Sequence, residues 1–137
     1  MRILIADDNK VILKHLTFLI ASITGVEIVS KHTNGLQVLK ALEQESDIDL
    51  VISDLHMPVM DGIELTLQLK ERFPKVKICL LTVADDPEII RRALNAGADG
   101  YILKIAELTQ LETAINLIVT GTKFYSPEVL ALLIRSN

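Results

Sequence analysis

Residues 49–62 of this chain read DLVISDLHMPVMDG and indicate its fold class. An apolar run passes into a stretch rich in turn-forming residues, which is the pattern of a short buried strand in a parallel sheet. Asp54 stands where the run ends, so we expect it at the carboxyl end of that strand, where open α/β sheets keep their functional sites. Asp7 and Asp8 follow the apolar run at residues 2–6 in the same way. Neighbouring carboxylates repel one another, so the sequence predicts a cation or a proton between them.

Strand-like and helix-like segments alternate along most of the chain. The strand patterns cover residues 2–6, 26–31, 49–53, 77–82 and 100–103, and the helical patterns cover residues 10–23, 36–44, 63–73, 87–96 and 107–119. This alternation predicts right-handed βαβ crossovers and one parallel sheet with helices on both faces. In the last segment, residues 121–125 break the helical pattern, and Ser126-Pro127 is a typical start for another helix. That final helix either caps the domain or begins a connector to another domain.

Composition limits the class of protein. The chain has 137 residues, enough for one domain with a buried core. No apolar stretch is long enough to cross a bilayer, so we expect no membrane partner. The single cysteine, Cys79, lies in an apolar strand pattern and suits a reducing compartment, which we take to be the cytoplasm. The net charge of -4 and the lack of a basic cluster argue against direct nucleic-acid binding.

Polar residues end four of the predicted strands, and the ends of parallel strands converge. These residues are Asp7, Asp8, Asp54, Thr82 and Lys104. Mg²⁺ prefers oxygen ligands and keeps several waters, so one or two carboxylates and a backbone carbonyl suffice. We expect Asp8 and Asp54 to bind Mg²⁺, with Asp7 acting directly or through water. The backbone carbonyl of His56 would complete the protein ligands. Taken alone, Asp7-Asp8 would more often be a helix N-cap, so the prediction rests on the whole set.

A carboxylate, Mg²⁺, a hydroxyl and an ammonium group together suit phosphoryl transfer to a carboxylate. Asp54 would attack in line and form a labile mixed anhydride. Thr82 and Lys104 would reach the phosphoryl oxygens by moving with their loops. The added charge would change the local electrostatics strongly.

The motif and its surroundings resemble the receiver domain of a two-component response regulator. Residues 54–62 match the phosphorylation loop of that family, and the resemblance covers about residues 1–120. The family's site residues fall at matching positions: Asp7, Asp8, Asp54, Thr82, Tyr101 and Lys104. The resemblance implies a flavodoxin-like doubly wound sheet of five βα units with strand order 2-1-3-4-5.

The resemblance also implies roles. Asp54 would accept a phosphoryl group from a sensor histidine kinase, and Asp7 and Asp8 would form the acidic Mg²⁺ pocket. Thr82 and Lys104 would sense the phosphate, and Tyr101 would be the switch aromatic. The surface of the fourth helix, fifth strand and fifth helix would then repack and control an output.

Within the family, residues 97–104 and 121–128 are similar to the subgroup with a LuxR-type helix-turn-helix output, such as NarL and FixJ. This similarity implies that residues 121–137 lead toward a DNA-binding domain absent from this chain. DNA would then be bound only through that domain. The alternative is a stand-alone receiver that acts through protein contacts.

The chain departs from the usual receiver pattern at two positions. Ile105 follows Lys104 where most receivers have Pro, so we expect a trans bond there, because a non-proline cis bond costs about 2.5–4 kcal/mol. Val83 follows Thr82 where Ala or Gly is usual. Its β-branched side chain is expected to narrow the approach to Asp54.

Other functions fit less well. A phosphatase of the haloacid dehalogenase type would use Asp54 as nucleophile, but its second Asp is replaced here by His56, so we expect a phosphoacceptor and not a turnover enzyme. A flavin- or nucleotide-binding protein would need a glycine- or hydroxyl-rich phosphate loop after the first strand, and the sequence DDNK has the wrong charge. The complete set of site residues counts against a degenerate receiver used only as a binding module.

The first and fifth predicted helices carry more apolar residues than one buried stripe requires. These residues are Val11, Ile12, Phe18, Leu19 and Ile20 in the first helix, and Leu117, Ile118 and Val119 in the fifth. Surplus apolar surface often marks an interface. We therefore expect homodimerisation through one of these helices, favoured by phosphorylation.

Overall fold

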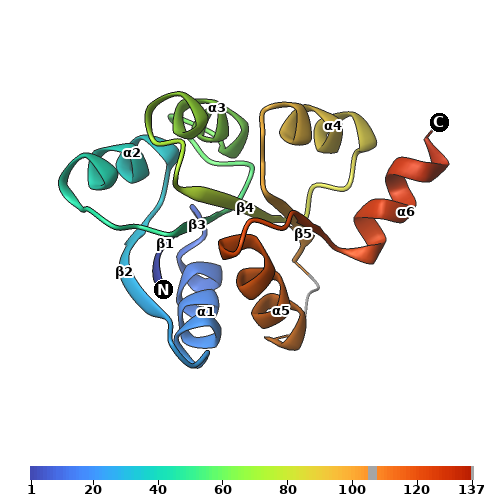
Figure 1. Ribbon diagram of the computed structural model, residues 1–137. Coiled ribbons are helices and arrows are strands. Elements are labelled where there is room, and N and C mark those ends of the chain that lie inside the picture. The colour runs from blue at the N-terminus through green and yellow to red at the C-terminus, as the bar shows by residue number, and fades with distance from the viewer. Residues whose placement is uncertain (105–107, 137) are drawn as a thin grey trace.

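A computed structural model of the protein describes residues 1–104 and 108–136. The elements follow in the order β1(Arg2–Ala6), α1(Lys10–Ala21), β2(Glu27–His32), α2(Gly35–Gln44), β3(Leu50–Ser53), α3(Gly62–Arg72), β4(Lys77–Thr82), α4(Pro87–Asn95), β5(Gly100–Leu103), α5(Leu108–Val119), β6(Phe124–Tyr125) and α6(Pro127–Arg135). All adjacent strands pair in parallel, in the order β2-β1-β3-β4-β5-β6. The predicted α/β fold with strand order 2-1-3-4-5 is confirmed (Figure 1), and β6 extends it.

The sheet separates two apolar cores. Helices α1 and α5 cover one face, and α2, α3 and α4 cover the other (Figure 1). Side chains alternate along each strand: Ile3 and Ile5 belong to the core under α1 and α5, whereas Leu4 and Ala6 belong to the opposite core. Because both faces of the central strands are covered, these strands read as continuous apolar runs.

The helix boundaries follow local signals. The helix predicted over residues 10–23 ends at Ala21, because the chain then turns and Gly25 adopts a positive φ of 86°. Asn9 is the N-cap of α1, and its side-chain oxygen accepts hydrogen bonds from the backbone N–H groups of Val11 and Ile12. Asn9, and neither Asp7 nor Asp8, is therefore the N-cap of this helix.

Residues 121–136 pack on the edge of the sheet beyond β5. Phe124 and Tyr125 form the short strand β6, which pairs with Gly100 and Tyr101. The sequence pattern indicated only a helix break over residues 121–125 and did not predict this strand, because two residues are too few to show an alternating pattern. Helix α6 begins at Pro127 as predicted and packs against α4 and β5.

Two further expectations concern the bond after Lys104 and the membrane. Ile105 lies outside the described residues, so the trans bond after Lys104 stays a prediction. In the part of the chain that the structure describes, no helix combines the length and apolarity needed to span a bilayer.

Candidate functional site

The ends of β1 and β3 bring three carboxylates together. Ala6 pairs with Ser53 at the ends of these neighbouring strands, and the backbone N–H of Asp54 donates to the Ala6 carbonyl at 2.9 Å. Asp7 is fully buried, Asp54 is 8% exposed, and Asp8 is exposed. Carboxylate oxygens from Asp7, Asp8 and Asp54 all lie within 4.8 Å of one another. The predicted convergence of these residues is therefore present in the structure.

Lys104 completes the cluster from the end of β5. Its Nζ donates to Asp7 Oδ2 at 2.7 Å and to Asp54 Oδ2 at 3.1 Å. Burial lowers the pKa of Lys104, but hydrogen bonds to Asp7 and Asp54 and the charges of both carboxylates outweigh burial, so the net pKa is raised. Lys104 therefore carries a positive charge at neutral pH and offsets part of the repulsion between the two acids.

The donor set fits a hard divalent cation. Octahedral Mg²⁺ has bonds of about 2.1 Å, so its ligand oxygens lie roughly 3–4 Å apart, which agrees with the spacing within 4.8 Å among the three carboxylates. His56 is exposed and, with Asp8, Pro58 and Asp61, lines a shallow cavity of about 370 Å³ beside the cluster. The cavity gives solvent access to the site, and the ligand role of the His56 carbonyl stays a prediction.

Thr82 and Tyr101 are connected through one residue that the sequence did not indicate. The backbone N–H of Ala84 donates to Thr82 Oγ1 at 3.2 Å, and the Tyr101 hydroxyl donates to the Ala84 carbonyl at 2.6 Å. Thr82 and Tyr101 are both fully buried. Burial, with the charges of nearby acids including Asp54, raises the pKa of Tyr101. Ala84 contributes only backbone groups, so its side chain gave no signal in the sequence.

Val83 lies beside Thr82 with 70% of its surface exposed. It is therefore on the outside of the β4–α4 loop, next to a residue of the site. This position is compatible with the predicted narrowing of the approach to Asp54, which stays a prediction.

The loop from Asp54 to Gly62 is held in shape by close backbone contacts. Gly62 N–H donates to the Leu55 carbonyl at 2.7 Å, and a Cβ on Gly62 would lie 2.6 Å from the Asp54 carbonyl oxygen. Met60 N–H donates to the Pro58 carbonyl at 2.7 Å, which closes a γ-turn around Val59. Val59 has a φ of 69°, a conformation in which a β-branched residue is strained.

Replacing Val59 with glycine should stabilise the protein. The strain of the left-handed conformation is worth about 1–2 kcal/mol, and the greater flexibility of glycine in the unfolded chain offsets about half of it. We expect Val59→Gly to raise the free energy of unfolding by about 1 kcal/mol in urea titrations. Asp47, at a φ of 61°, is the matched control. Asp tolerates this conformation better, so Asp47→Gly should change stability less, and an equal or larger gain there would contradict the assignment of strain to Val59.

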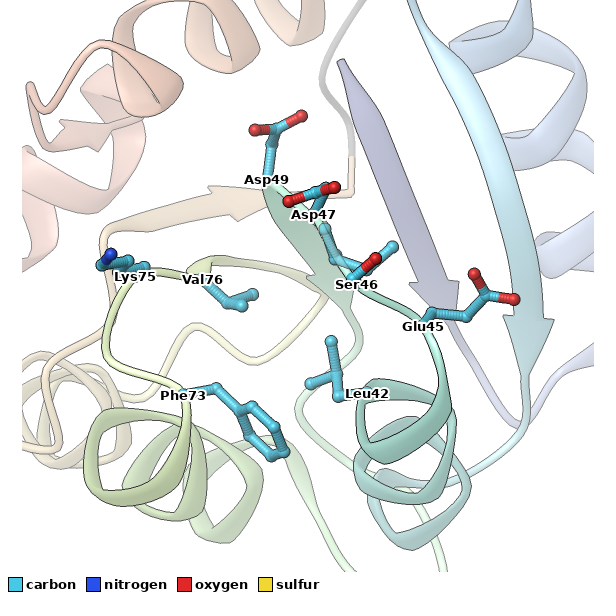
Figure 2. Close-up of a pocket in the computed structure, with 9 residues that line it drawn as sticks. Leu42, Glu45, Ser46, Asp47, Asp49, Phe73, Lys75 and Val76 are labelled. Atoms are coloured by element: carbon cyan, nitrogen blue, oxygen red, sulfur yellow. The ribbon is translucent and has the colours of Figure 1, made fainter.

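A second cavity, of about 410 Å³, lies at the amino end of β3, away from Asp54 (Figure 2). Its apolar walls are Leu42, Ile48, Phe73 and Val76, and its polar walls are Glu45, Ser46, Asp47, Asp49 and Lys75. Two of the acids already have partners, because Asp49 accepts a hydrogen bond from the Arg2 backbone and Glu45 pairs with the Arg2 side chain. This cavity brings no further group to the carboxylate cluster.

Comparisons with known proteins agree with this geometry. Residues 3–116 match the family described as response regulator receiver domain. The chain is 33% identical over 129 residues to the response regulator GacA of Pseudomonas viridiflava, a match covering 94% of this chain and 60% of GacA. It is 41% identical over 111 residues to YhcZ of Bacillus subtilis (strain 168), an uncharacterized transcriptional regulatory protein, covering 81% of this chain and 51% of YhcZ.

Solved structures give the same result. RcsB from Salmonella enterica serovar Typhimurium, bound to promoter P1flhDC in the presence of the phosphomimetic BeF3-, is similar with a TM-score of 0.89 and 29% identity. That match covers 98% of this chain and 67% of the RcsB chain. Receiver domains bind Mg²⁺ through acidic residues, and the described part of this chain contains a cluster of three acids, Asp7, Asp8 and Asp54. The chain therefore belongs to the response regulator receiver domain family of two-component signalling and is related to LuxR-type regulators.

Proposed function

We propose that this chain is a phosphorylation-dependent switch in which Asp54 accepts a phosphoryl group from a sensor histidine kinase in the presence of Mg²⁺. The placement of the Asp54 carboxylate carries the proposal. It lies within 4.8 Å of the ligand oxygens of Asp7 and Asp8, and its Oδ2 is 3.1 Å from Lys104 Nζ. A nucleophilic carboxylate, an acidic pocket for a hard cation and an ammonium group are the parts that this transfer needs.

Each side chain has a separate part in the transfer. A carboxylate oxygen of Asp54 attacks phosphorus in line, while the bond from phosphorus to the donor nitrogen breaks and the electron pair leaves with that nitrogen. Bound Mg²⁺ would neutralise charge on the phosphoryl oxygens. Lys104 exchanges a carboxylate contact for a phosphoryl oxygen, and the Thr82 hydroxyl donates to another. Water later hydrolyses the mixed anhydride, so the chain acts as a phosphoacceptor and not as a turnover enzyme.

Intact-mass measurement tests this proposal directly. The protein is incubated with acetyl phosphate and Mg²⁺, and a matched sample contains excess EDTA. We expect the mass of one phosphoryl group to appear only with Mg²⁺ and to disappear slowly after the donor is removed. Equal labelling with EDTA would contradict the metal assignment, and no labelling in either sample would contradict phosphoacceptance.

We further propose that the output is transcriptional and that the switch works in the cytoplasm. The RcsB structure contains a promoter, and this chain spans about 60% of the length of GacA. A LuxR-type domain would then bind DNA, since this chain has a net charge of -4. Reading the gene beyond residue 137 separates the alternatives. A helix-turn-helix sequence supports this output, and an immediate stop codon supports a stand-alone receiver that acts through protein contacts.

Shortening Val83 should change the rates of the site. If its exposed side chain narrows the approach to Asp54, Val83→Ala should speed phosphorylation by acetyl phosphate and also loss of the phosphoryl group. We expect the rate of phosphorylation and the rate of phosphoryl loss each to rise about fivefold, which corresponds to a barrier lower by roughly 1 kcal/mol. Leu67→Ala shortens an exposed apolar side chain of α3, outside both the site and the α1/α5 surface, and should leave both rates unchanged. Unchanged rates in Val83→Ala would contradict the steric role.

We also propose that phosphorylation favours a homodimer through α1 and α5. These helices pack against each other on one face of the sheet (Figure 1), so the two predicted faces are one surface. Val11 and Phe18 are 79% and 76% exposed and lie two helical turns apart, and Leu117 of α5 is also exposed. Ile20 and Ile118 are buried in the core, so including them in the surplus apolar surface was wrong.

Sedimentation with and without beryllofluoride and Mg²⁺ tests the dimer. We expect wild type to shift from monomer toward dimer with the phosphoryl mimic, and Phe18→Ser to weaken dimerisation about tenfold or more, because an aromatic anchor is lost. Leu67→Ser is the control, since Leu67 is an exposed residue of α3 on the other face. If wild type stays monomeric at high concentration with the mimic bound, the dimer proposal is contradicted. The output would then be the release of a neighbouring domain.

A further inference from the structure

The segment from Phe124 to Ser136, here named the C-terminal clasp, covers the edge of the sheet next to Tyr101. Its strand β6 pairs with β5, and its helix α6 packs against α4 and β5. Figure 1 shows α6 beyond the β5 side of the sheet. Val129 is fully buried in the same apolar core as Tyr101, and Leu132 and Leu133 pack against that core while partly exposed. Phe124 and Tyr125 also pack against the two cores while partly exposed. The clasp is thus attached by one fully buried apolar side chain, four partly exposed ones and a strand of two residues.

The docked clasp contains an unfavourable feature at its first helical turn. Ser126 occupies the N-cap position of α6 and is 1% exposed, yet its side chain makes no capping hydrogen bond. Its Oγ is buried and has no hydrogen-bond partner among the described residues. A hydroxyl removed from water without a partner costs free energy. The clasp therefore docks against a penalty that an undocked clasp, with Ser126 in water, would not have.

The clasp is also connected to the site through Tyr101. The Ser126 N–H donates to the Tyr101 carbonyl at 3.1 Å, and Tyr125 pairs with Tyr101 across the strands. From its other end, the Tyr101 hydroxyl bonds the Ala84 carbonyl, and the Ala84 N–H bonds Thr82. Val129 of α6 lies in the same core as the Tyr101 ring, and α6 packs against β5, so a Tyr101 ring that left the core would disturb this packing. The docked clasp therefore favours the inward ring.

We propose that the clasp is a metastable conformational element whose docking is coupled to the inward position of Tyr101. Coupling between two equilibria is reciprocal, so any change that holds Thr82, Ala84 and Tyr101 in place also favours the docked clasp. This step rests on the proposed function: phosphorylation of Asp54 strengthens docking, because a Thr82 hydroxyl that donates to a phosphoryl oxygen is held in one position while it still accepts from the Ala84 N–H. Phosphorylation of Asp54 thereby changes the docking of the clasp at the surface beyond β5.

Amide hydrogen exchange on the complete chain tests the metastability. Losing a capping serine normally weakens a helix, but Ser126→Ala removes an unpaired buried hydroxyl here. We expect exchange in α6 to slow about tenfold relative to wild type. Faster exchange in Ser126→Ala would show that the hydroxyl stabilises the docked clasp, and this would overturn the proposal.

A pair of α6 variants tests the coupling without any phosphodonor. Val129→Ala weakens docking, so exchange should accelerate about tenfold both in α6 and at the Ala84 amide, which lies in the β4–α4 loop. Leu130→Ala is the control, because Leu130 belongs to the same helix but is 45% exposed and should leave Ala84 unchanged. Acceleration confined to α6 in Val129→Ala would overturn the coupling.

Beryllofluoride and Mg²⁺ separate this proposal from the function on which it rests. Binding at the site is followed at the Leu55 amide, which donates to Asp54 Oδ1 at 2.7 Å. We expect a change in the NMR chemical shift of the Leu55 amide together with slower hydrogen exchange in α6. A shifted Leu55 signal with unchanged α6 exchange would overturn the link to phosphorylation. No shift at Leu55 would instead contradict the proposed function, and the three variants above would still decide the clasp.

Discussion

Asp54→Asn is expected to abolish phosphorylation by acetyl phosphate completely. The amide oxygen is a poor nucleophile and cannot form the acyl phosphate, while the side chain keeps nearly the same size. Because Asp54 is 8% exposed and contacts Lys104, this substitution also removes a charge next to the ammonium group. Intact mass after incubation with Mg²⁺ and donor is the measurement, and the expected labelling is none.

Two further variants make this result specific. Asp47→Asn is the matched control, because Asp47 is an exposed acid at the opposite end of the sheet and Asn tolerates its positive φ of 61°. It should be labelled at the wild-type rate. Asp8→Ala should lose most of the labelling and the dependence on Mg²⁺, since it removes one of the clustered carboxylates. Undiminished labelling of Asp54→Asn would refute Asp54 as the phosphoacceptor.

Asp99→Ala is expected to destabilise the fold by about 3 kcal/mol. The Asp99 side chain is largely buried, and its Oδ2 accepts hydrogen bonds from Lys70 Nζ at 2.6 Å and from the Ile78 backbone at 3.0 Å. The substitution leaves a buried backbone N–H and a partly buried ammonium group without their partner. It also removes a polar link between α3 and β4. The decrease in the free energy of unfolding can be measured by urea titration.

An ion pair of similar length but greater exposure provides the comparison. Arg72 Nη2 lies 2.7 Å from Glu43 Oε1, and both side chains are substantially exposed. Glu43→Ala should cost less than about 1 kcal/mol, because water screens an exposed pair and replaces its lost partner. Equal losses for the two variants would show that burial does not decide the strength of these pairs.

The acidic cluster at the carboxyl end of the sheet was well predicted from the sequence, because Asp7 and Asp54 directly follow apolar strands. Asp7, Asp54 and Lys104 could be placed together from the order of residues alone, since parallel strands end at one edge. Ala84 could not be found in this way. Its role comes from backbone groups, and their positions depend on how the β4–α4 loop folds against Tyr101.

Exposure was harder to predict than position. Apolar residues in α1 looked equivalent in the sequence, but Phe18 faces solvent and Ile20 faces the core. Their directions depend on how α1 lies on the sheet and against α5. The sequence pattern indicated more apolar residues than one buried stripe needs. Only the packing of α1 showed which of these residues are exposed and which are buried in the core.

The residue pattern alone was enough to predict the succession of elements from β1 to α5 along the chain, the α/β class and the acidic cluster at the strand ends. These features depend on local periodicity and on the rule that parallel strands share an edge. The folded chain was needed to show that residues 124–136 pack beside Tyr101, that Ser126 is buried with its hydroxyl unpaired among the described residues, and that Val59 is strained. Such features arise from contacts between distant segments, and no local pattern of residue types records those contacts.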